Sequence, residues 1–267
     1  MNRLPSFRRT LLSGGALLIC LASIATRTTA QEKTEKAEPK TEQKADLSKA
    51  IAQLKDRNVE VRRAAIETLM QSDDPAAIEP LLPLLGDQEQ TVRSEAALAL
   101  GELGATKAVA QLITMLKSKS PRDHRSAAVA LGMIGGTAAR EALLSMLNDP
   151  SPEERESAVA ALGNLRDTGA VDAVIGLLGD PHHFVRASAA VALSRFRDKR
   201  AVEPLLKALS DAEASVRSAT VFALGELGDP RALEPLTRLL SGEPNENVRK
   251  QLESTLEQLR QPASRKP

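Results

Sequence analysis

The hydrophobic positions of this chain recur every 31 residues from Asp46 onward. Leucines keep this interval at Leu69, Leu100, Leu131, Leu162, Leu193 and Leu224. A second leucine series runs from Leu54 to Leu240, and an alanine series from Ala77 to Ala232, at the same interval. Three independent series at one period predict seven repeated units, the last with one extra residue in its turn. The units are 46–76, 77–107, 108–138, 139–169, 170–200, 201–231 and 232–262.

Each unit contains two apolar stretches with helical periodicity, joined by a polar turn. In the sixth unit the first helix is predicted at 201–209, with Pro204 tolerated in its first turn. The second is predicted at 216–224, ending at Gly225 or at Gly228-Asp229. No stretch alternates with period two, so we expect no strands. A single helical pair cannot bury its apolar face, whereas stacked pairs share one core. The fold class is therefore predicted as all-α, an αα-superhelix of about seven two-helix units.

The second helices resemble HEAT repeats, in particular the short HEAT-like repeats of phycobilin lyases. The resemblance rests on Val92-Arg93, Ala96-Ala97 and Ala99-Leu100-Gly101-Glu102-Leu103-Gly104, with close copies around Arg62, Arg155, Arg186 and Arg217. It covers residues 46–262 and implies a right-handed solenoid whose second helices line the concave surface. It says little about the molecular task, because a fold of this kind hosts many functions.

An aspartate precedes an arginine by six residues in five units. The pairs are Asp56/Arg62, Asp87/Arg93, Asp149/Arg155, Asp180/Arg186 and Asp211/Arg217. No pair differs from the others, as a catalytic pair would. The resemblance implies a structural ladder of hydrogen bonds within and between turns, for which the planar arginine fork is suited. The third unit has Ser118 and His124 in these places and Pro121 in its turn, which predicts a local weak point or a specialised surface.

The outward face of the second helices carries the candidate binding residues. We number each second helix from its arginine, or from His124, as position 0. At about 100° per residue, positions −1, 3, 4, 7 and 10 face the core and position 5 faces away. Position 5 is apolar in five central units, and we call these residues the apolar row: Leu98, Val129, Ala160, Val191 and Phe222. Glu67 and Ser254 take this position in the terminal units, and a polar rim including Arg125 and Arg195 flanks the row.

Two interpretations of the apolar row remain open at the level of sequence. An apolar centre with a polar rim is typical of a protein or peptide interface. Packing between neighbouring second helices is the alternative, because curvature brings their inner faces close together. Replacing Phe222 with Asp distinguishes the two, since an interface residue would affect binding and a packing residue would affect folding.

Composition and the scarcity of reactive side chains argue against catalysis. The chain has no Trp or Tyr and four Phe, so base-stacking surfaces are not expected, and a formal charge of +1 gives no electrostatic attraction to nucleic acid. The three histidines, His124, His182 and His183, do not form a metal-ligand pattern. None is followed by Glu, whereas the HEAT-like deoxyhypusine hydroxylases hold iron with His-Glu pairs. Without a phosphate loop, nucleophile elbow or zinc motif, we expect no enzyme activity, metal or cofactor.

The N-terminus predicts export. Arg3, Arg8 and Arg9 precede an apolar stretch at 11–25 and the small residues Thr28-Thr29-Ala30, as in a signal peptide at 1–30 cleaved after Ala30. Phe7-Arg8-Arg9-Thr10-Leu11-Leu12 resembles a twin-arginine motif, with an ordinary basic start as the equal alternative. The apolar stretch is short for a membrane span, so an uncleaved anchor is the lesser alternative. Ile19 before Cys20, the single cysteine, disfavours a lipoprotein.

Residues 31–45 and 263–267 flank the repeats. The first segment contains no large apolar side chain and is predicted to be a disordered charged linker, and the second a disordered tail. The mature chain is then expected in the periplasm or outside the cell, without a transmembrane span and as a monomer. Its expected role is that of a non-catalytic scaffold or adaptor binding a protein or peptide in the concave groove, not nucleic acid. The alternatives are a lyase-type accessory that presents a small ligand or client protein to another catalyst, and a spacer without a partner.

Overall fold

Two layers of helices build the repeat array in the computed structural model, which describes residues 47–118 and 120–261. The inner helices are α2 (Val59–Gln71), α4 (Gln90–Glu102), α6 (Pro121–Ile134), α8 (Pro152–Leu165), α10 (His183–Phe196), α12 (Ala214–Leu227) and α14 (Glu246–Arg260). The outer helices are α3 (Ile78–Leu81), α5 (Val109–Met115), α7 (Thr137–Met146), α9 (Val171–Gly176), α11 (Val202–Ala208) and α13 (Leu233–Gly242). Residues 47–53 are also helical, and the described ranges contain no strand.

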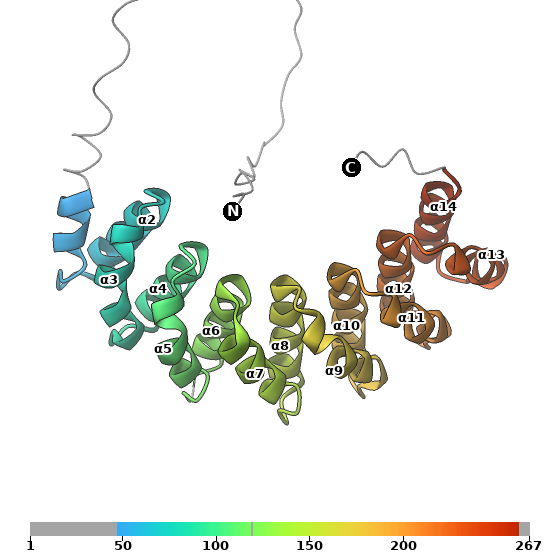
Figure 1. The fold of residues 1–267 in the computed structure, drawn as a ribbon, viewed down its shortest axis with the longest axis horizontal. Coiled ribbons are helices and arrows are strands. Elements are labelled where there is room, and N and C mark those ends of the chain that lie inside the picture. Colours follow the sequence, from blue (N-terminus) through green and yellow to red (C-terminus); the bar gives the residue numbers. More distant parts are fainter. Residues whose placement is uncertain (1–46, 119, 262–267) are drawn as a thin grey trace, which may run out of the picture. The chain divides into compact units, whose positions relative to one another are not determined.

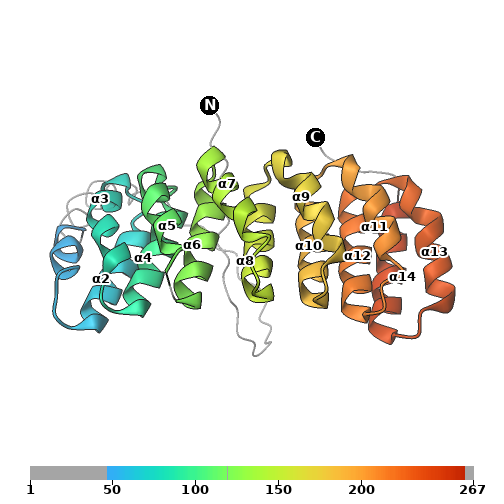
Figure 2. The same ribbon diagram turned by 90° about the horizontal axis from the view of Figure 1, so that it is seen from below.

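The inner helices lie side by side along the concave edge of this array, with the outer helices behind them (Figures 1 and 2). The leucines at position 7, such as Leu100, Leu131 and Leu162, are completely buried between the two layers. Alanines at the start of the outer helices, such as Ala108 and Ala139, are equally buried. The 31-residue series of the sequence is therefore the core of the molecule, and the predicted all-α solenoid is confirmed.

The inner helices end where the chain enters the left-handed region, at position 11 of each of the first six units. Glycine takes this position in three of them, at Gly104, Gly135 and Gly228. Asp73, Arg166 and Arg197 take it in the other three, with φ of 51°, 56° and 53°. In the sixth unit the helix therefore ends at Gly228. Gly225, the other predicted end, lies buried inside α12.

Most outer helices are short and begin as a 3₁₀ turn. These turns are η1 (Pro75–Ala77), η3 (Thr106–Ala108), η4 (Thr168–Ala170), η6 (Lys199–Ala201) and η7 (Pro230–Ala232). Aspartate caps four of them by accepting the backbone N–H two residues later, as Asp198 does from Arg200 at 2.9 Å. Two outer helices also run into a second 3₁₀ turn, η2 (Leu82–Gly86) and η5 (Leu177–Gly179). Pro83 lacks the N–H that would continue α3.

The predictions for the signal peptide, the linker and the tail fall on residues 1–46 and 262–267, outside the described residues. Within the described ranges, no helix is both long and apolar enough to cross a membrane.

Candidate protein-interaction face

The apolar row lies at the surface of the inner helices. Phe222 is 42% exposed and Ala160 is exposed, while Leu98, Val129 and Val191 are half-buried. None of the five belongs to the buried core or to the partly buried hydrophobic residues packed against that core. Met133, at position 9 of α6, is 46% exposed, and it and Phe222 are the large hydrophobic side chains exposed within the described residues. The row is therefore apolar surface that core burial does not account for.

Glycine at position 8 brings the central inner helices into backbone contact. A Cβ added at Gly132 would lie 2.7 Å from the carbonyl oxygen of Ala161, and one at Gly163 would lie 2.9 Å from Cα of Ala192. Gly101 approaches Ala130 in the same way. Glycine is needed because any side chain would collide with the next helix. This role was not predicted, although glycine recurs every 31 residues at 101, 132 and 163.

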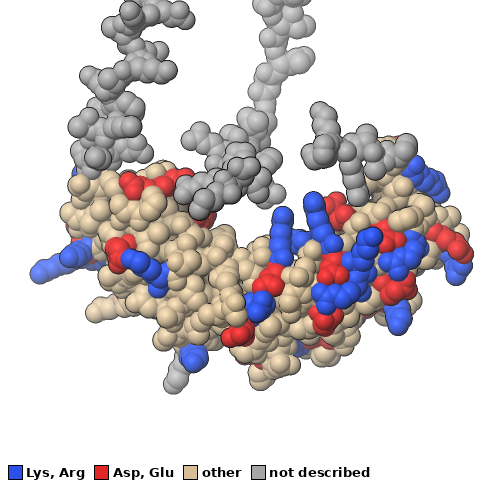
Figure 3. All heavy atoms as spheres, viewed as in Figure 1, with Lys and Arg blue, Asp and Glu red and all other residues tan. Residues whose placement is uncertain are grey.

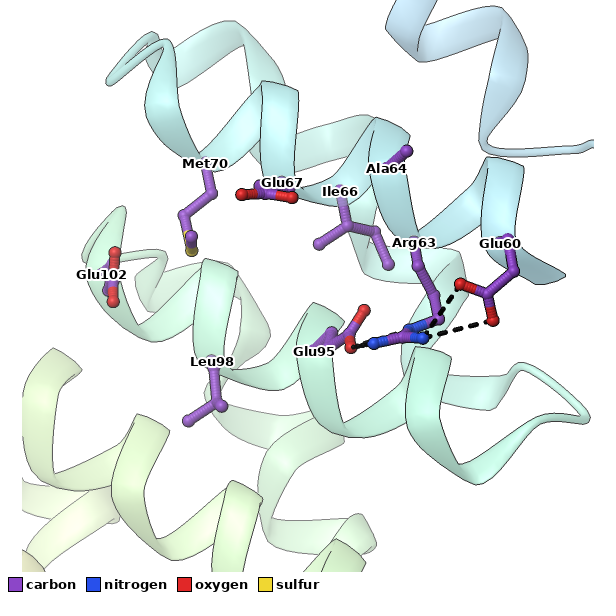
Figure 4. Close-up of a pocket in the computed structure, with 9 residues that line it drawn as sticks. All are labelled: Glu60, Arg63, Ala64, Ile66, Glu67, Met70, Glu95, Leu98 and Glu102. Atoms are coloured by element: carbon purple, nitrogen blue, oxygen red, sulfur yellow. Dashed lines mark hydrogen bonds and ion pairs between the residues drawn. The ribbon is translucent and has the colours of Figure 1, made fainter.

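The first pair of inner helices departs from this rule. Position 8 of α2 is Met70, and a hollow of about 400 Å³ lies between α2 and α4. Figure 4 shows Met70 on α2 pointing toward α4, where Leu98 is a further lining residue. Ile66 and Ala64 complete the apolar part of the lining. The hollow is thus a second candidate binding feature on the inner face, adjoining the first residue of the apolar row.

Four carboxylates and one guanidinium surround this hollow. Arg63 donates from Nε to Glu95 at 2.8 Å and from Nη1 to Glu60 at 3.1 Å, and these bonds raise the pKa of Arg63. Glu67 accepts one hydrogen bond, from Gln71 at 3.1 Å. Glu102 is exposed and makes no hydrogen bond or ion pair with any residue of the described ranges. Two carboxylates around the apolar floor therefore have no cationic partner among residues 47–118 and 120–261.

The two predicted rim arginines lie farther along the inner helices. Arg125, at position 1 of α6, is exposed and forms no ion pair within 47–118 and 120–261. Arg195, at position 9 of α10, is exposed and donates to the side-chain oxygen of Asn164 on α8. The central part of the inner face therefore carries charges of both signs, because Glu156 on α8 and Glu226 on α12 occupy the same rim positions, whereas four carboxylates and one arginine line the hollow at its α2–α4 end.

The predicted ladder connects each unit to the next. Arg155 donates from Nη1 to the backbone oxygen of Asp149 at 2.8 Å, within its own unit. Its Nε and Nη2 donate to the two carboxylate oxygens of Asp180 in the following unit, at 2.7 and 2.9 Å. This lowers the pKa of Asp180 despite the opposing effect of its burial. The predicted partners thus meet through the backbone, and the carboxylate pairs with the arginine of the unit before.

The same arrangement recurs along the array with small variations. Carboxylate pairs across units are Arg62–Asp87, Arg155–Asp180, Arg186–Asp211 and Arg217–Glu243. Asp56, at the start of the array, accepts from its own unit alone, through the backbone bond from Arg62 at 2.9 Å and a bond from the Asn58 N–H. Because these bonds fix turn against turn, the geometry is that of a structural element.

The third unit keeps the ladder with different residues. Arg93 donates to Asp123 at 3.0 and 2.9 Å, and the His124 ring donates from Nδ1 to Glu154 at 3.0 Å. Both carboxylates lie in the first turn of their inner helices, directly before position 0, instead of in the preceding turn. The predicted interruption is therefore a substitution of partners. The hydrogen bonding of these two carboxylates is less complete, since Asp123 Oδ1 and Glu154 Oε2 are buried without a hydrogen-bond partner.

His124 is held between two acceptors. Its Nε2 lies 2.5 Å from the backbone oxygen of Ser118, and its Nδ1 faces the Glu154 carboxylate. Burial lowers the pKa of His124, but the hydrogen bonds to Ser118 and Glu154 together outweigh it and raise the pKa above the ordinary value. Both ring nitrogens can donate only in the imidazolium form, so the geometry favours a charged histidine.

The remaining histidines form no site. His182 and His183 are exposed and contact the ring of Phe184, with centroids 5.6 and 5.7 Å apart. Among the described residues there is no group of three or more His, Cys, Asp or Glu placed to hold a metal ion.

Comparison with known proteins identifies the family. A sequence profile of HEAT repeats matches residues 47–132, 79–147, 140–219 and 202–267. The chain therefore belongs to the HEAT-repeat family. No curated protein matches the sequence significantly.

Solved structures share the fold at low sequence identity. One is the complex of CpcE and CpcF of phycocyanin lyase from Nostoc sp. PCC7120, with 23% identity, a TM-score of 0.52, and coverage of 88% of this chain and 99% of that one. Another is YibA of Escherichia coli, with 23% identity, a TM-score of 0.53, and coverage of 80% and 82%. At this identity the likeness concerns the fold, including the HEAT-like repeats of the lyase type.

Proposed function

We propose that this protein is an exported, non-catalytic scaffold that binds a protein or peptide on the inner face of its repeat array. The observation that carries the proposal is the apolar row, which lies at the surface and outside the packed core. Exposed apolar side chains within a polar rim are typical of protein interfaces. Arg125 and Arg195 would supply rim contacts and orientation, while the row would supply most of the affinity.

Cross-linking to a partner tests the proposal. The purified chain is the bait in a native cell-envelope fraction, and the control is the same chain carrying Val191→Asp and Phe222→Asp, verified as folded by helical circular dichroism. We expect a partner that the first bait retains and the second loses. Equal recovery by both baits would show that the apolar row is not the interface. Unfolding of the single variant Phe222→Asp would show that the row is packing.

Export is proposed from the N-terminal sequence at residues 1–30. Mass spectrometry of the protein purified from its source tests this step. We expect a mature chain beginning at Gln31, in the envelope or the medium. A chain that retains residues 1–30 in the cytoplasmic fraction would remove export from the proposal and leave the scaffold role to be judged by the cross-linking alone.

A second candidate function is an accessory that presents a small ligand or client protein to another catalyst. The observation in its favour is the likeness in fold to the CpcE–CpcF complex of phycocyanin lyase. The absorbance spectrum and metal content of the protein purified from its source discriminate the two. A chromophore or iron that co-purifies in stoichiometric amount favours the accessory, and a colourless, metal-free protein favours the scaffold.

A further inference from the structure

The hollow between α2 and α4 offers an apolar floor beneath carboxylates that lack a cation. Met70 lies between Glu67 and Glu102 in Figure 4, and Leu98 on α4 contributes further apolar lining. The hollow measures about 400 Å³, within the range of roughly 300–1,000 Å³ typical of pockets that hold a specific group. It is therefore large enough for side chains of a partner segment.

The carboxylates that line the hollow favour a positively charged side chain in it. Arg63 already neutralises Glu60 and Glu95, through bonds at one end of the hollow. Glu67 and Glu102 at the other end have no ion-pair partner within the described residues. An anionic occupant would be repelled there, whereas a lysine or arginine could lay its aliphatic stem on the floor and its charge between the carboxylates.

The hollow is continuous with the apolar row. Glu67 occupies position 5 of α2, the same place that Leu98 occupies in α4 as the first member of the row. A segment that covers the row would therefore bring one of its ends to the hollow. Farther along, the rim carries charges of both signs, Arg125 and Arg195 together with Glu156 and Glu226, so the hollow differs in joining its carboxylates to an apolar floor.

We infer that the α2–α4 hollow is a subsite for a lysine or arginine at one end of an otherwise apolar partner segment. The inference rests on the proposed function, because it assigns a further part of the same partner. It adds a specificity that the apolar row alone does not have: the row accepts apolar side chains of either orientation, whereas the carboxylates fix which end of the segment lies at α2.

Methionine at position 8 explains why the subsite occurs at this junction. Gly101, Gly132 and Gly163 let the following junctions close until the helix backbones touch. Met70 places a long side chain at the corresponding point, and the space beside it is the hollow. The hollow thus accompanies the long side chain of Met70, because Ser194, which replaces glycine at position 8 of α10, is small and buried. Glu67 in place of an apolar residue adds the charge.

Fluorescence anisotropy with two defined peptides and the full chain tests the inference. The probes are about 12 residues long, enough to span several inner helices when extended at about 3.3 Å per residue. One carries two lysines followed by alternating leucine and serine, and the other carries two glutamates in place of the lysines. We expect the lysine peptide to bind more tightly by about fivefold or more, the effect of two exposed ion pairs.

Charge removal in the hollow is the decisive variant. Glu67→Gln with Glu102→Gln should abolish the preference for lysine without unfolding, because neither side chain takes part in an ion pair. Glu253→Gln with Glu257→Gln is the matched control, since it removes two exposed carboxylates from α14 at the other end of the array. The control should keep the preference. If the control loses it as well, binding reflects net charge and the inference is wrong.

Phe222→Asp separates this inference from the proposed function. We expect it to weaken both peptides and leave their ratio unchanged. If Phe222→Asp weakens binding while the glutamine variant leaves the ratio unchanged, the subsite is refuted and the scaffold stands. If the glutamine variant removes the ratio while Phe222→Asp does nothing, the subsite stands and the row is refuted. Failure of both peptides to bind the unmodified chain counts against both.

Discussion

Neighbouring inner helices meet in two different ways in this molecule. Between α6 and α8, Gly132 allows backbone contact, and a Cβ there would lie 2.7 Å from the Ala161 oxygen. Between α2 and α4, Met70 takes the same position and a hollow of about 400 Å³ remains. The side chain at position 8 therefore differs between this closed junction and this open one. A regular solenoid can acquire a local binding feature by a single departure from its repeat.

The largest effect is expected from opening a closed junction. Gly132→Met introduces the side chain of the open junction where no room exists, and overpacking of this kind costs about 3 kcal/mol. Chemical denaturation should show this loss in the free energy of unfolding. Gly176→Met is the control, because a Cβ at Gly176 meets no atom within 4 Å, and it should change stability little. Since methionine has a higher helix propensity than glycine, equal losses in both variants would mean that introducing a long apolar side chain anywhere on the array, and not the closed junction, is responsible.

The ladder gives a second comparison, between the unit in which His124 bonds the next unit and the units in which an arginine does so. Folding raises the pKa of His124, so its stabilisation is fully present below the unfolded value of about 6.5 and is lost as the pH rises through the folded value. The free energy of unfolding should therefore fall as the pH rises above about 6.5, on the order of 1 kcal/mol for one hydrogen bond.

His124→Arg is the control for this pH dependence. It installs the side chain that the other ladder positions carry and should flatten the profile over the same range. The acid limb should remain in both proteins, because folding lowers the pKa of Asp180, Asp211 and Glu243 and their stabilisation is lost as the pH falls. A profile that declines equally in the variant would place the titrating group elsewhere.

Substitution at the helix ends should have a smaller effect and should raise the free energy of unfolding instead of lowering it. Arg166 and Arg197 adopt left-handed backbone conformations, with φ of 56° and 53°, where three other units have glycine. Arg197→Gly should stabilise the chain by about 0.5–1 kcal/mol, because glycine takes this conformation without steric cost. Thermal unfolding of Arg197→Gly beside Arg197→Ala checks this, since alanine keeps the strain. If alanine stabilises as much as glycine, charge rather than backbone strain is the cause.

The sequence predicted the regular part of this molecule well. A strict 31-residue period, with leucine at position 7 and alanine at the start of each outer helix, could only bury its apolar positions by stacking, and those residues are the core. The same periodicity placed the apolar row at the surface. The helix ends were predicted less precisely. Gly225 and Gly228 are both suitable helix ends in sequence, and Gly225 is part of the helix because it packs, buried, against Thr255 of the next inner helix.

The irregular parts could not be predicted because they depend on contacts between units. Arg155 pairs with Asp180, 25 residues away, whereas the sequence pattern drew attention to Asp149 in its own unit. In the third unit the carboxylate that pairs with Arg93 is Asp123, within the inner helix, at a position where the other units gave no reason to expect a ladder residue. The hollow could not be predicted either. It depends on Met70 standing where later helices have Gly101, Gly132 and Gly163, and the close contacts of these glycines exist only between packed helices.

Outer ion pairs show that exposed charge alone does not define a site. Figure 3 shows basic and acidic side chains interleaved over the C-terminal units. Arg200 pairs there with Asp172 and Asp198, and Arg231 pairs with Glu203 and Asp229. These charges satisfy one another and link neighbouring units. The carboxylates of the α2–α4 hollow differ because two of them, Glu67 and Glu102, have no ion-pair partner in the part of the chain that the structure describes.

The smallest expected change in stability sharpens this difference. Arg63 is half-buried and bonds Glu60 and Glu95 at the solvent-accessible rim of the hollow. Arg63→Gln should leave the melting temperature almost unchanged, because exposed ion pairs contribute little to stability. It should nevertheless tighten binding of the lysine peptide, since two further carboxylates are released for a cation. Arg238→Gln is the control, because it breaks an exposed pair with Glu234 on α13, away from the inner face. Tighter binding in both variants would indicate a general charge effect, whereas tighter binding in Arg63→Gln alone would assign cation recognition to the open junction.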